Sequence, residues 1–254
     1  MSTATKARSA KGPLARAKTS EAVAGHLLDE FVAARLLPGD RIDLFEVAEE
    51  LGVSRQPVRE ALVLLERDGT VRMPFHRGAF LGDIDAASIR EAFALYAVLS
   101  ALTAKVAAGV VTTEEQEALT LAAERAAASR VAMEFELHAR EFRRVVNHAG
   151  GGGQLRALLR TFTGLVVAVS SAAVEDDLAA EQALLATEFD ALLRRDAEAS
   201  ARAAAEHVRS TGERGIRILI DRGAIPAEAT TTDPTDATRM SALTSVMHAL
   251  TETT

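Results

Sequence analysis

The chain has 254 residues, 48% of them hydrophobic, and a formal net charge of −7, which is enough sequence for one large domain or two ordinary ones. It has no cysteine, which excludes disulfides, thiolate metal sites and cysteine nucleophiles. The basic start lacks the apolar segment of a secretory signal, and no uninterrupted apolar run approaches the ~20 residues of a membrane span. We therefore expect a cytoplasmic protein with no membrane partner. Few aromatic residues and much alanine and leucine favour helices.

The charge is unevenly distributed along the chain. Residues 1–83 contain 12 Lys and Arg and 12 Asp and Glu, whereas residues 84–254 contain 17 and 24. The first 20 residues contain five basic residues and no acidic one. Affinity for phosphate depends on local patches rather than on total charge. The distribution thus fits an N-terminal part that contacts nucleic acid and an acidic C-terminal body.

The first segments are predicted to be a tail, a helix and a turn. Residues 1–18 are basic and polar, and we expect a flexible tail with at most a weak, unspecific attraction to DNA. A helix is predicted from about Ser20, its N-cap, to Leu36. Residues 37–40 then form a turn.

Residues 44–69 are predicted to form two short helices joined by a tight turn. Apolar residues recur at i, i+3, i+4 and i+7 in both segments. Gly52 suits the left-handed C-cap of the first helix. Ser54 is placed to cap the second, with Pro57 in its first turn, where a missing N–H costs little.

The polar face of the second helix favours DNA recognition. At about 100° per residue, Arg55 and Arg59 lie on one side, with Gln56 beside them and the apolar stripe elsewhere. Arginine contacts guanine O6 and N7 bidentately in the major groove, and such contacts cluster at the N-terminal end of a recognition helix. The alternative is a solvated surface helix with two unremarkable arginines.

Residues 70–81 are predicted to form two short strands around a tight loop, a wing. Gly78 supplies backbone freedom, while His76 and Arg77 lie at the tip. A wing tip commonly approaches a phosphate or the minor groove, which makes Arg77 the stronger candidate of the two. The alternative is a surface hairpin that contacts nothing.

Residues 38–78, from Pro-Gly-Asp-Arg-Ile through Val-Ser-Arg-Gln-Pro-Val-Arg-Glu-Ala-Leu to His-Arg-Gly, closely resemble the winged-helix domain of GntR-type bacterial transcriptional regulators. The resemblance implies that double-stranded operator DNA is contacted by the second helix and the wing, that is by Ser54, Arg55, Gln56, Arg59, His76, Arg77 and Gly78. Phe45 is a departure, because some members place there an arginine that adds a contact. Readout should then depend more on Arg55 and Arg59.

Beyond a boundary at residues 82–85, with Asp85 as N-cap, the pattern is helical. Helices are predicted at residues 86–109, 113–129, 131–148, 154–173, 176–194 and 197–222. Thr112 and Glu115 offer a capping box, and residues 150–153, four glycines with alanine before them, break the chain. Residues 224–254 are expected to be disordered, although residues 240–250 suit a weak helix. The predicted fold is mainly α, with a winged helix-turn-helix over residues 19–82 and an antiparallel bundle over residues 85–222.

This C-terminal half resembles the FCD domain of FadR-like GntR regulators, mostly in pattern. The resemblance implies a homodimer and a cavity for a small effector, often a carboxylate, with a divalent metal held by one Asp and three His. Carried over, those four positions hold Ala139, Arg143, Leu185 and His207. One ligand of four does not make a metal site. We therefore expect no metal and no other cofactor.

Arg143 is the most informative replacement. An arginine stays charged at physiological pH and grips a carboxylate bidentately, so our hypothesis is an effector site anchored by Arg143 and His207. The alternative is that Arg143 pairs with Glu188 and that His207 is a satisfied core histidine. Tyr96, the only tyrosine, either lines the cavity or packs. A fatty or aromatic acid is as plausible an effector as a small hydroxy acid.

Two other classes of protein compete with this interpretation. An enzyme is disfavoured because the sequence has no phosphate-binding glycine loop, no His-Glu-x-x-His and no Gly-x-Ser-x-Gly. A helical protein-interaction adaptor, or a DNA-binding protein without an effector, remains as an alternative. The sequence predicts a homodimeric regulator of transcription. We expect it to be a repressor that binds an operator, with a small metabolite relieving the repression.

Overall fold

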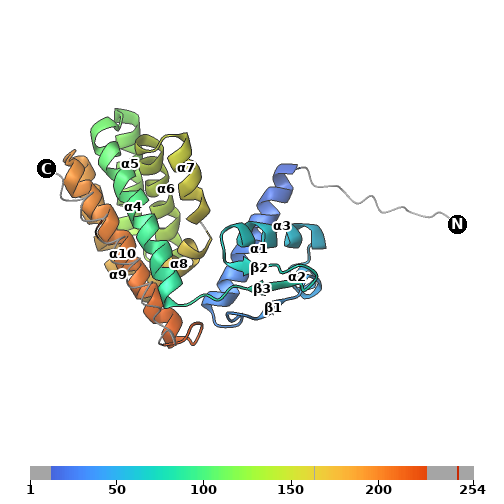
Figure 1. The fold of residues 1–254 in the computed structure, drawn as a ribbon. Coiled ribbons are helices and arrows are strands. Elements are labelled where there is room, and N and C mark those ends of the chain that lie inside the picture. Colours follow the sequence, from blue (N-terminus) through green and yellow to red (C-terminus); the bar gives the residue numbers. More distant parts are fainter. Residues whose placement is uncertain (1–12, 163, 228–244, 246–254) are drawn as a thin grey trace.

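The computed structural model describes residues 13–162, 164–227 and 245, and they form a small α/β part followed by a larger bundle of helices (Figure 1). The first part contains α1 (Pro13–Val32), β1 (Arg41–Ile42), α2 (Leu44–Glu50), α3 (Arg55–Arg67), β2 (Val71–Arg72) and β3 (Ala79–Leu81). The bundle contains α4 (Ala86–Val110), α5 (Thr113–Ala128), α6 (Ala132–Gly150), α7 (Gly153–Leu159), η1 (Arg160–Phe162), α8 (Leu165–Asp176), α9 (Leu178–Leu193) and α10 (Ala197–Asp221). The mainly helical, two-part fold predicted from the sequence is thus confirmed.

The first part is a winged helix. Helix α1 packs on α3. The core between them is centred on the fully buried side chains of Phe31, Val58 and Leu62. The sheet has the order β1-β3-β2 with both pairs antiparallel. The sequence predicted β2 and β3 but missed β1, because two residues are too few to show a period of two.

The first helix begins and ends earlier than predicted. It starts at Pro13 rather than Ser20, since proline is well tolerated in a first helical turn. Ser20 is buried inside the helix and is not its N-cap. The helix ends at Val32, and Ala34 beyond it has a left-handed φ of 57°. Of the tail expected over residues 1–18, the first 12 residues lie outside the described part.

The capping predictions at the boundary and in the bundle are confirmed. Asp85 and Ser88 form a reciprocal capping box at the start of α4. Thr112 and Glu115 do the same at the start of α5. Helix α6 ends at Gly150, within the predicted glycine break.

The single helix predicted over residues 154–173 is wrong. The chain instead forms α7, the short η1 and α8, with a bend of 61° between the two halves. Gly164 lies at the start of α8, and a methyl group on it would lie 3.6 Å from Leu28 Cδ1 and 3.6 Å from Asp68 Oδ2. Leu28 and Asp68 belong to the winged helix, so the break lies where the bundle meets the winged helix, a contact that a helical period does not reveal.

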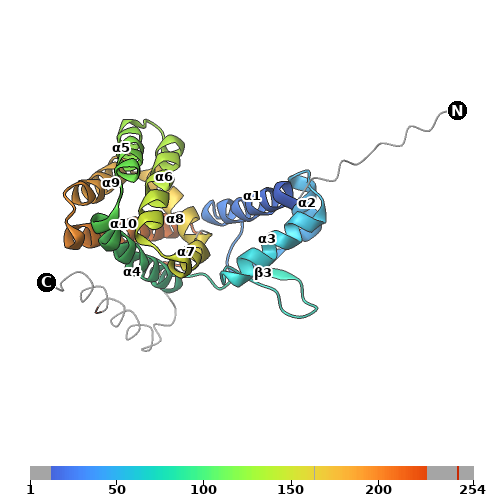
Figure 2. The same cartoon turned by 90° about the horizontal axis from the view of Figure 1, so that it is seen from above.

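The two parts share one apolar core. A continuous cluster of buried side chains runs from α1 and α3 through α8 to α4 and α10, and the end of α1 faces the bundle in the view from above (Figure 2). Ala224 and Ile225 are buried in the same cluster, which corrects the expectation that disorder begins at residue 224. Residues 228–244 and 246–254 lie outside the described part.

Helix α4 lies along α6 and α10 in the bundle. Among the described helices, it is the single unbroken one long and apolar enough to span a membrane, with a mean hydropathy of 1.7. Part of its apolar surface remains exposed along one side: Leu95, Leu102, Val106 and Val110, at 38–55%.

Candidate DNA-recognition surface and C-terminal pocket

The orientation of α3 follows from its apolar stripe. Pro57, Val58, Ala61, Leu62 and Leu65 are buried against the winged-helix core. The opposite face is therefore exposed, and it carries Arg55, Gln56 and Arg59 as predicted. Ser54 is at the N-cap position with extended backbone, and its side chain makes no capping hydrogen bond. The start of this helix thus presents its polar side chains to solvent.

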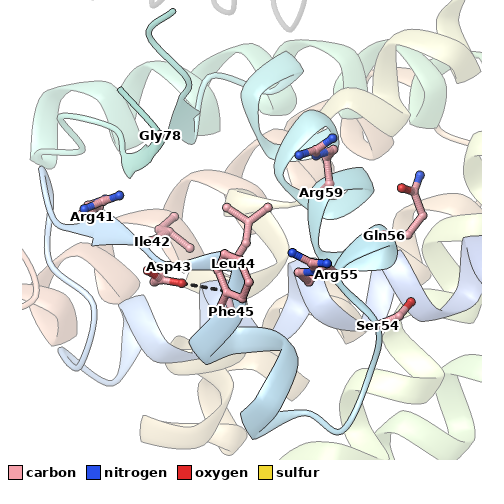
Figure 3. Close-up of a pocket in the computed structure, with 10 residues that line it drawn as sticks. All are labelled: Arg41, Ile42, Asp43, Leu44, Phe45, Ser54, Arg55, Gln56, Arg59 and Gly78. Carbon is pink, nitrogen blue, oxygen red and sulfur yellow. Dashed lines mark hydrogen bonds between the residues drawn. The ribbon is translucent and has the colours of Figure 1, made fainter. Parts of the chain in front are cut away.

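These side chains border a hollow of about 650 Å³ between α3, α2 and the wing (Figure 3). Five of its lining residues were predicted to contact DNA, four at the recognition helix and one on the wing: Ser54, Arg55, Gln56, Arg59 and Gly78. The other five were not among the predicted contacts: Arg41, Ile42, Asp43, Leu44 and Phe45. Three arginines, from β1 and α3, therefore surround one open cavity. Arg41 was missed because it follows a turn and belongs to the two-residue strand β1.

Arg55 and Gln56 make local contacts on this surface. The guanidinium of Arg55 lies over the ring of Phe45, with 4.8 Å from Cζ to the ring centroid. Phe45 is 64% exposed and sits in the first turn of α2, where Asp43 accepts a hydrogen bond from its backbone N–H. The side chain of Gln56 donates to Glu60.

The wing tip is exposed and sharply turned. His76 and Gly78 have φ values of 58° and 90°, so both lie in the left-handed region, which an imidazole-bearing residue adopts less readily than glycine. His76 and Arg77 are exposed but do not line the hollow. Phe75 is 87% exposed, and its ring centroid lies 3.9 Å from that of His76.

A second pocket lies inside the helical bundle. It has a volume of about 140 Å³, and the three predicted effector residues, Tyr96, Arg143 and His207, all line it. Helix α8 contributes one wall, with Val166, Val167, Ser170, Ser171 and Val174. The ring of Tyr96 also packs against Phe162, at 5.9 Å between centroids. The structure thus brings the predicted residues together from α4, α6 and α10.

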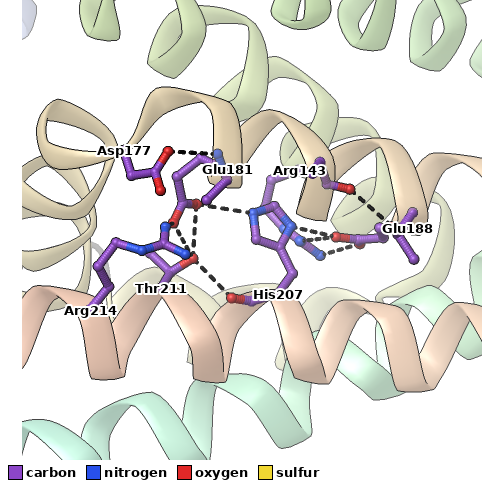
Figure 4. Close-up of polar contacts among 10 residues, drawn as sticks. Arg143, Asp177, Glu181, Glu188, His207, Thr211 and Arg214 are labelled. Carbon is purple, nitrogen blue, oxygen red and sulfur yellow. Dashed lines mark hydrogen bonds and ion pairs between the residues drawn. The ribbon is translucent and has the colours of Figure 1, made fainter.

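The charged groups beside this pocket form a closed network (Figure 4). Arg143 donates to both carboxylate oxygens of Glu188, at 2.8 and 2.6 Å. His207 Nδ1 lies 3.1 Å from the same carboxylate, and its Nε2 lies 3.5 Å from Glu181. Glu181 also accepts from Arg214 and Thr211. The pairing of Arg143 with Glu188, the alternative raised from the sequence, is therefore present, and Glu181 and Arg214 were not anticipated.

Burial and pairing act in opposite directions on these groups. Burial disfavours the charged form of Glu188, but Arg143 and His207 outweigh it and lower the pKa of that carboxyl. Burial likewise disfavours charged His207, yet hydrogen bonds with Glu181 and Glu188 raise its pKa. Burial opposes the charge on Arg143 too, and Glu188 more than compensates, so its pKa is raised. The network therefore favours the ionised form of each of the three groups.

The four positions carried over from the family metal site do converge. Ala139, Arg143, Leu185 and His207 all line the pocket. They do not fit a divalent cation, because a guanidinium and two aliphatic side chains replace three of its ligands. In the described part of the chain, no group of three or more His, Asp or Glu is arranged to hold a metal ion.

Comparison with known sequences identifies relatives of part of the chain. Residues 19–81 match the family of bacterial regulatory proteins named gntR. An uncharacterised helix-turn-helix transcriptional regulator of Mycobacterium tuberculosis is 36% identical over 149 residues, 59% of this chain and 61% of the relative. The repressor RspR of Escherichia coli is 30% identical over 83 residues, 33% of this chain and 36% of RspR. The chain thus spans less than two thirds of these relatives' length.

Solved structures share the fold of both parts. Escherichia coli McbR/YncC superposes with a TM-score of 0.60 at 21% identity, covering 81% of this chain and 98% of that one. A regulator described as GntR from Rhodococcus sp. RHA1 gives 0.50 at 23% identity, covering 80% and 98%. The family and its matched relatives are regulators of transcription and not enzymes, which agrees with the sequence.

Proposed function

We propose that this chain is a cytoplasmic, homodimeric repressor of the gntR type that binds a pseudo-palindromic operator. The match of residues 19–81 to the gntR family of bacterial regulatory proteins supports the proposal. The bundle acts as an FCD-type domain of the FadR-like subfamily, in which a small metabolite weakens operator binding. The observation that carries the DNA-binding part is the exposed hollow in which Arg41, Arg55 and Arg59 meet.

Helix α3 enters the major groove by its N-terminal end. Arg55 and Arg59 then present planar guanidinium groups to guanine O6 and N7, while Ser54 and Gln56 contact the backbone or neighbouring base edges. On the wing, Arg77, His76 and Gly78 approach an adjacent phosphate or the minor groove. Net charges of zero over residues 1–83 and −7 beyond them favour this orientation, with the bundle held away from the DNA.

The exposed side of α4 supports a homodimer. Leu95, Leu102, Val106 and Val110 are seven, four and four residues apart, which places them on one side of the helix. Apolar side chains in such a stripe bury well against the same stripe of a second copy. A two-fold dimer in turn presents two recognition helices to two half-sites, which gives the operator its symmetry.

The pocket supports control by a small effector. A cavity of about 140 Å³ accepts a molecule about the size of benzene, by analogy with an engineered apolar cavity of similar volume. The effector is a small carboxylate that takes up the guanidinium of Arg143 in exchange for Glu188, with His207 and Tyr96 as further polar contacts. The exchange keeps the charge of Arg143 paired, while Glu188 keeps the contact of its carboxylate with His207, 3.1 Å away.

Helix α8 connects the pocket to the DNA-binding part. Its side chains line the pocket, and α8 packs against α1. At its start, a methyl group on Gly164 would lie 3.6 Å from Leu28 of α1 and 3.9 Å from Leu65 of α3. At the other end, Arg222 joins Glu175 of α8 to the carbonyl oxygen of Val32 in α1. An effector that shifts α8 therefore shifts the two helices that hold the recognition surface, and favours a dimer geometry that no longer fits both half-sites.

The decisive experiment is selection from a library of randomised DNA duplexes by the full-length protein, followed by fluorescence anisotropy on the enriched duplex. We expect a two-fold symmetric sequence, steep weakening with salt, and a loss of about 1–3 kcal/mol per half-site for Arg59→Ala. Arg67→Ala is the matched control, since Arg67 lies at the far end of α3. No enrichment would refute DNA recognition and leave the adaptor class, whereas equal binding by both variants would refute a base contact by Arg59.

A further inference from the structure

We propose that Phe45 is a positioning residue for Arg55, which holds the guanidinium edge-on to the DNA and thereby sets the preference for one guanine in each half-site. The inference rests on the proposed DNA-binding function. It assigns a role to a side chain of α2, outside the recognition helix.

The geometry joins two elements across the hollow. Arg55 is the first residue of α3 and Phe45 the second of α2, and the guanidinium lies over the ring at 4.8 Å. Both side chains line the hollow (Figure 3). The backbone that carries the ring is fixed, because Asp43 caps α2 by accepting from the backbone N–H groups of Phe45 and Glu46.

The contact with Phe45 gives Arg55 a partner that is not a hydrogen-bond acceptor of the carboxylate kind. A guanidinium carries five N–H donors, and the ring attracts its charge through the π face rather than through an oxygen. In the described part of the chain, no carboxylate pairs with Arg55. A carboxylate partner would instead occupy the same donors that contact guanine O6 and N7. Phe45 therefore orients the group without competing with the base.

Arg59 provides an internal comparison. It lines the same hollow from one turn further along α3, but the ring of Phe45 lies under Arg55 and not under Arg59. Loss of the ring should therefore affect the base read by Arg55 and spare the base read by Arg59. That difference separates a positioning role from a general effect on α3.

The test uses the full-length protein and the duplex it selects, in which each guanine is replaced in turn by 7-deazaguanine. This base lacks the N7 acceptor but keeps Watson–Crick pairing. The guanine read by Arg55 is the one whose replacement weakens the wild type but not Arg55→Ala. Phe45→Leu removes the ring and keeps an apolar side chain, and Phe45→Tyr restores the ring.

We expect Phe45→Leu to weaken operator binding about 2- to 5-fold per half-site, the range of one exposed cation–π contact. In this variant, replacing the guanine read by Arg55 with 7-deazaguanine should cost less affinity than in the wild type. Replacing the guanine read by Arg59 should cost the same as in the wild type. Phe45→Tyr should behave as wild type, and Phe45→Leu should cost nothing more in the Arg55→Ala background. Equal melting temperatures by circular dichroism establish that the variants fold alike.

Three results would overturn the inference while leaving DNA binding intact. These are unchanged binding by Phe45→Leu, an equal loss with or without Arg55, and the absence of any guanine whose penalty depends on Arg55. Failure of the wild type to select a sequence is a different outcome. It refutes the proposed function itself, and the role of Phe45 with it.

Discussion

Glu188 accepts hydrogen bonds from both terminal nitrogens of Arg143, at 2.8 and 2.6 Å, with the two side chains 0% and 15% exposed. The pair lies beside the pocket that Arg143 lines. The charge of the arginine is balanced from within the protein, so the proposed carboxylate effector has to replace Glu188 rather than meet a free cation.

Breaking this pair from one side should destabilise the protein strongly. Arg143→Met leaves Glu188 buried without its main partner, and Glu188→Leu leaves Arg143 in the same condition. We expect each to cost about 3–5 kcal/mol, or about 6–20 °C in Tm. Differential scanning calorimetry measures both.

The double variant Arg143→Met with Glu188→Leu should lose less than either single change, because no unpaired charge remains. Arg144→Ala is the control, since its partner Glu141 lies on the exposed surface and such pairs contribute at most about 1 kcal/mol. Additive losses in the double variant would show that the pair is not coupled.

The contribution of His207 should depend on pH. It is faced by Glu181 and Glu188 on its two ring nitrogens and by Arg143 beyond. Burial disfavours its charge, but the two carboxylates outweigh this and raise its pKa in the folded state above the ordinary value of about 6.5. Its stabilising effect is therefore complete below about pH 6.5 and is lost as the pH rises through the folded pKa.

The comparison that tests this is the Tm of the wild type minus that of His207→Gln, measured from pH 6 to pH 9. We expect the difference to be largest at pH 6 and to decrease toward pH 9. Glu188 contributes in the acidic range instead. Because its pKa is lowered in the folded state, its stabilising effect is lost as the pH falls through that folded-state pKa. A difference that grows with pH would contradict the assignment of a charged His207.

The wing should contribute affinity with little sequence information. Arg77 is exposed at the tip and lies outside the hollow, as expected of a group that contacts phosphate. Arg77→Ala should weaken binding to selected and random duplexes alike and reduce the slope of log K against log salt by about 1 per protomer. Anisotropy titrations at several salt concentrations measure both, and a loss confined to the selected duplex would instead indicate a base contact.

The sequence predicted what depends on local patterns. The apolar stripe of α3, the left-handed Gly52 and the N-cap Asp85 are local features, and each lies in the structure as expected. The missed features depend on contacts distant in sequence. The break before α8 lies next to α1 and α3, and the contacts of Glu181 with Thr211 and Arg214, 30 and 33 residues away, were not anticipated. The partner of Arg143, 45 residues away, was foreseen as one of two alternatives.

Filling the pocket should abolish the response to an effector while leaving DNA binding intact. Ala139 lines the pocket and is partly buried, so Ala139→Leu takes up much of a volume of about 140 Å³. We expect benzoate, lactate or octanoate, whichever raises the Tm of the wild type, to leave that of the variant unchanged. A shift that survives the substitution would place the effector elsewhere.

A charge on the exposed side of α4 should disrupt the dimer. Leu102→Glu places a carboxylate within the apolar stripe, whereas Leu137→Glu makes the same change on α6, at a residue 65% exposed. Sedimentation velocity should show a monomer for the first variant and a dimer for the second. A dimer in both cases would assign the interface to another surface.

The core that runs from α1 through α8 to α10 also governs how the molecule comes apart. The winged helix buries Leu28 and Leu65 next to Gly164 of the neighbouring bundle. Separating the two parts would therefore expose apolar surface on each. Heat should then melt both halves in a single cooperative step. The winged helix on its own should aggregate and be short-lived. The lifetime of the proposed DNA-binding part therefore depends on an intact helical bundle.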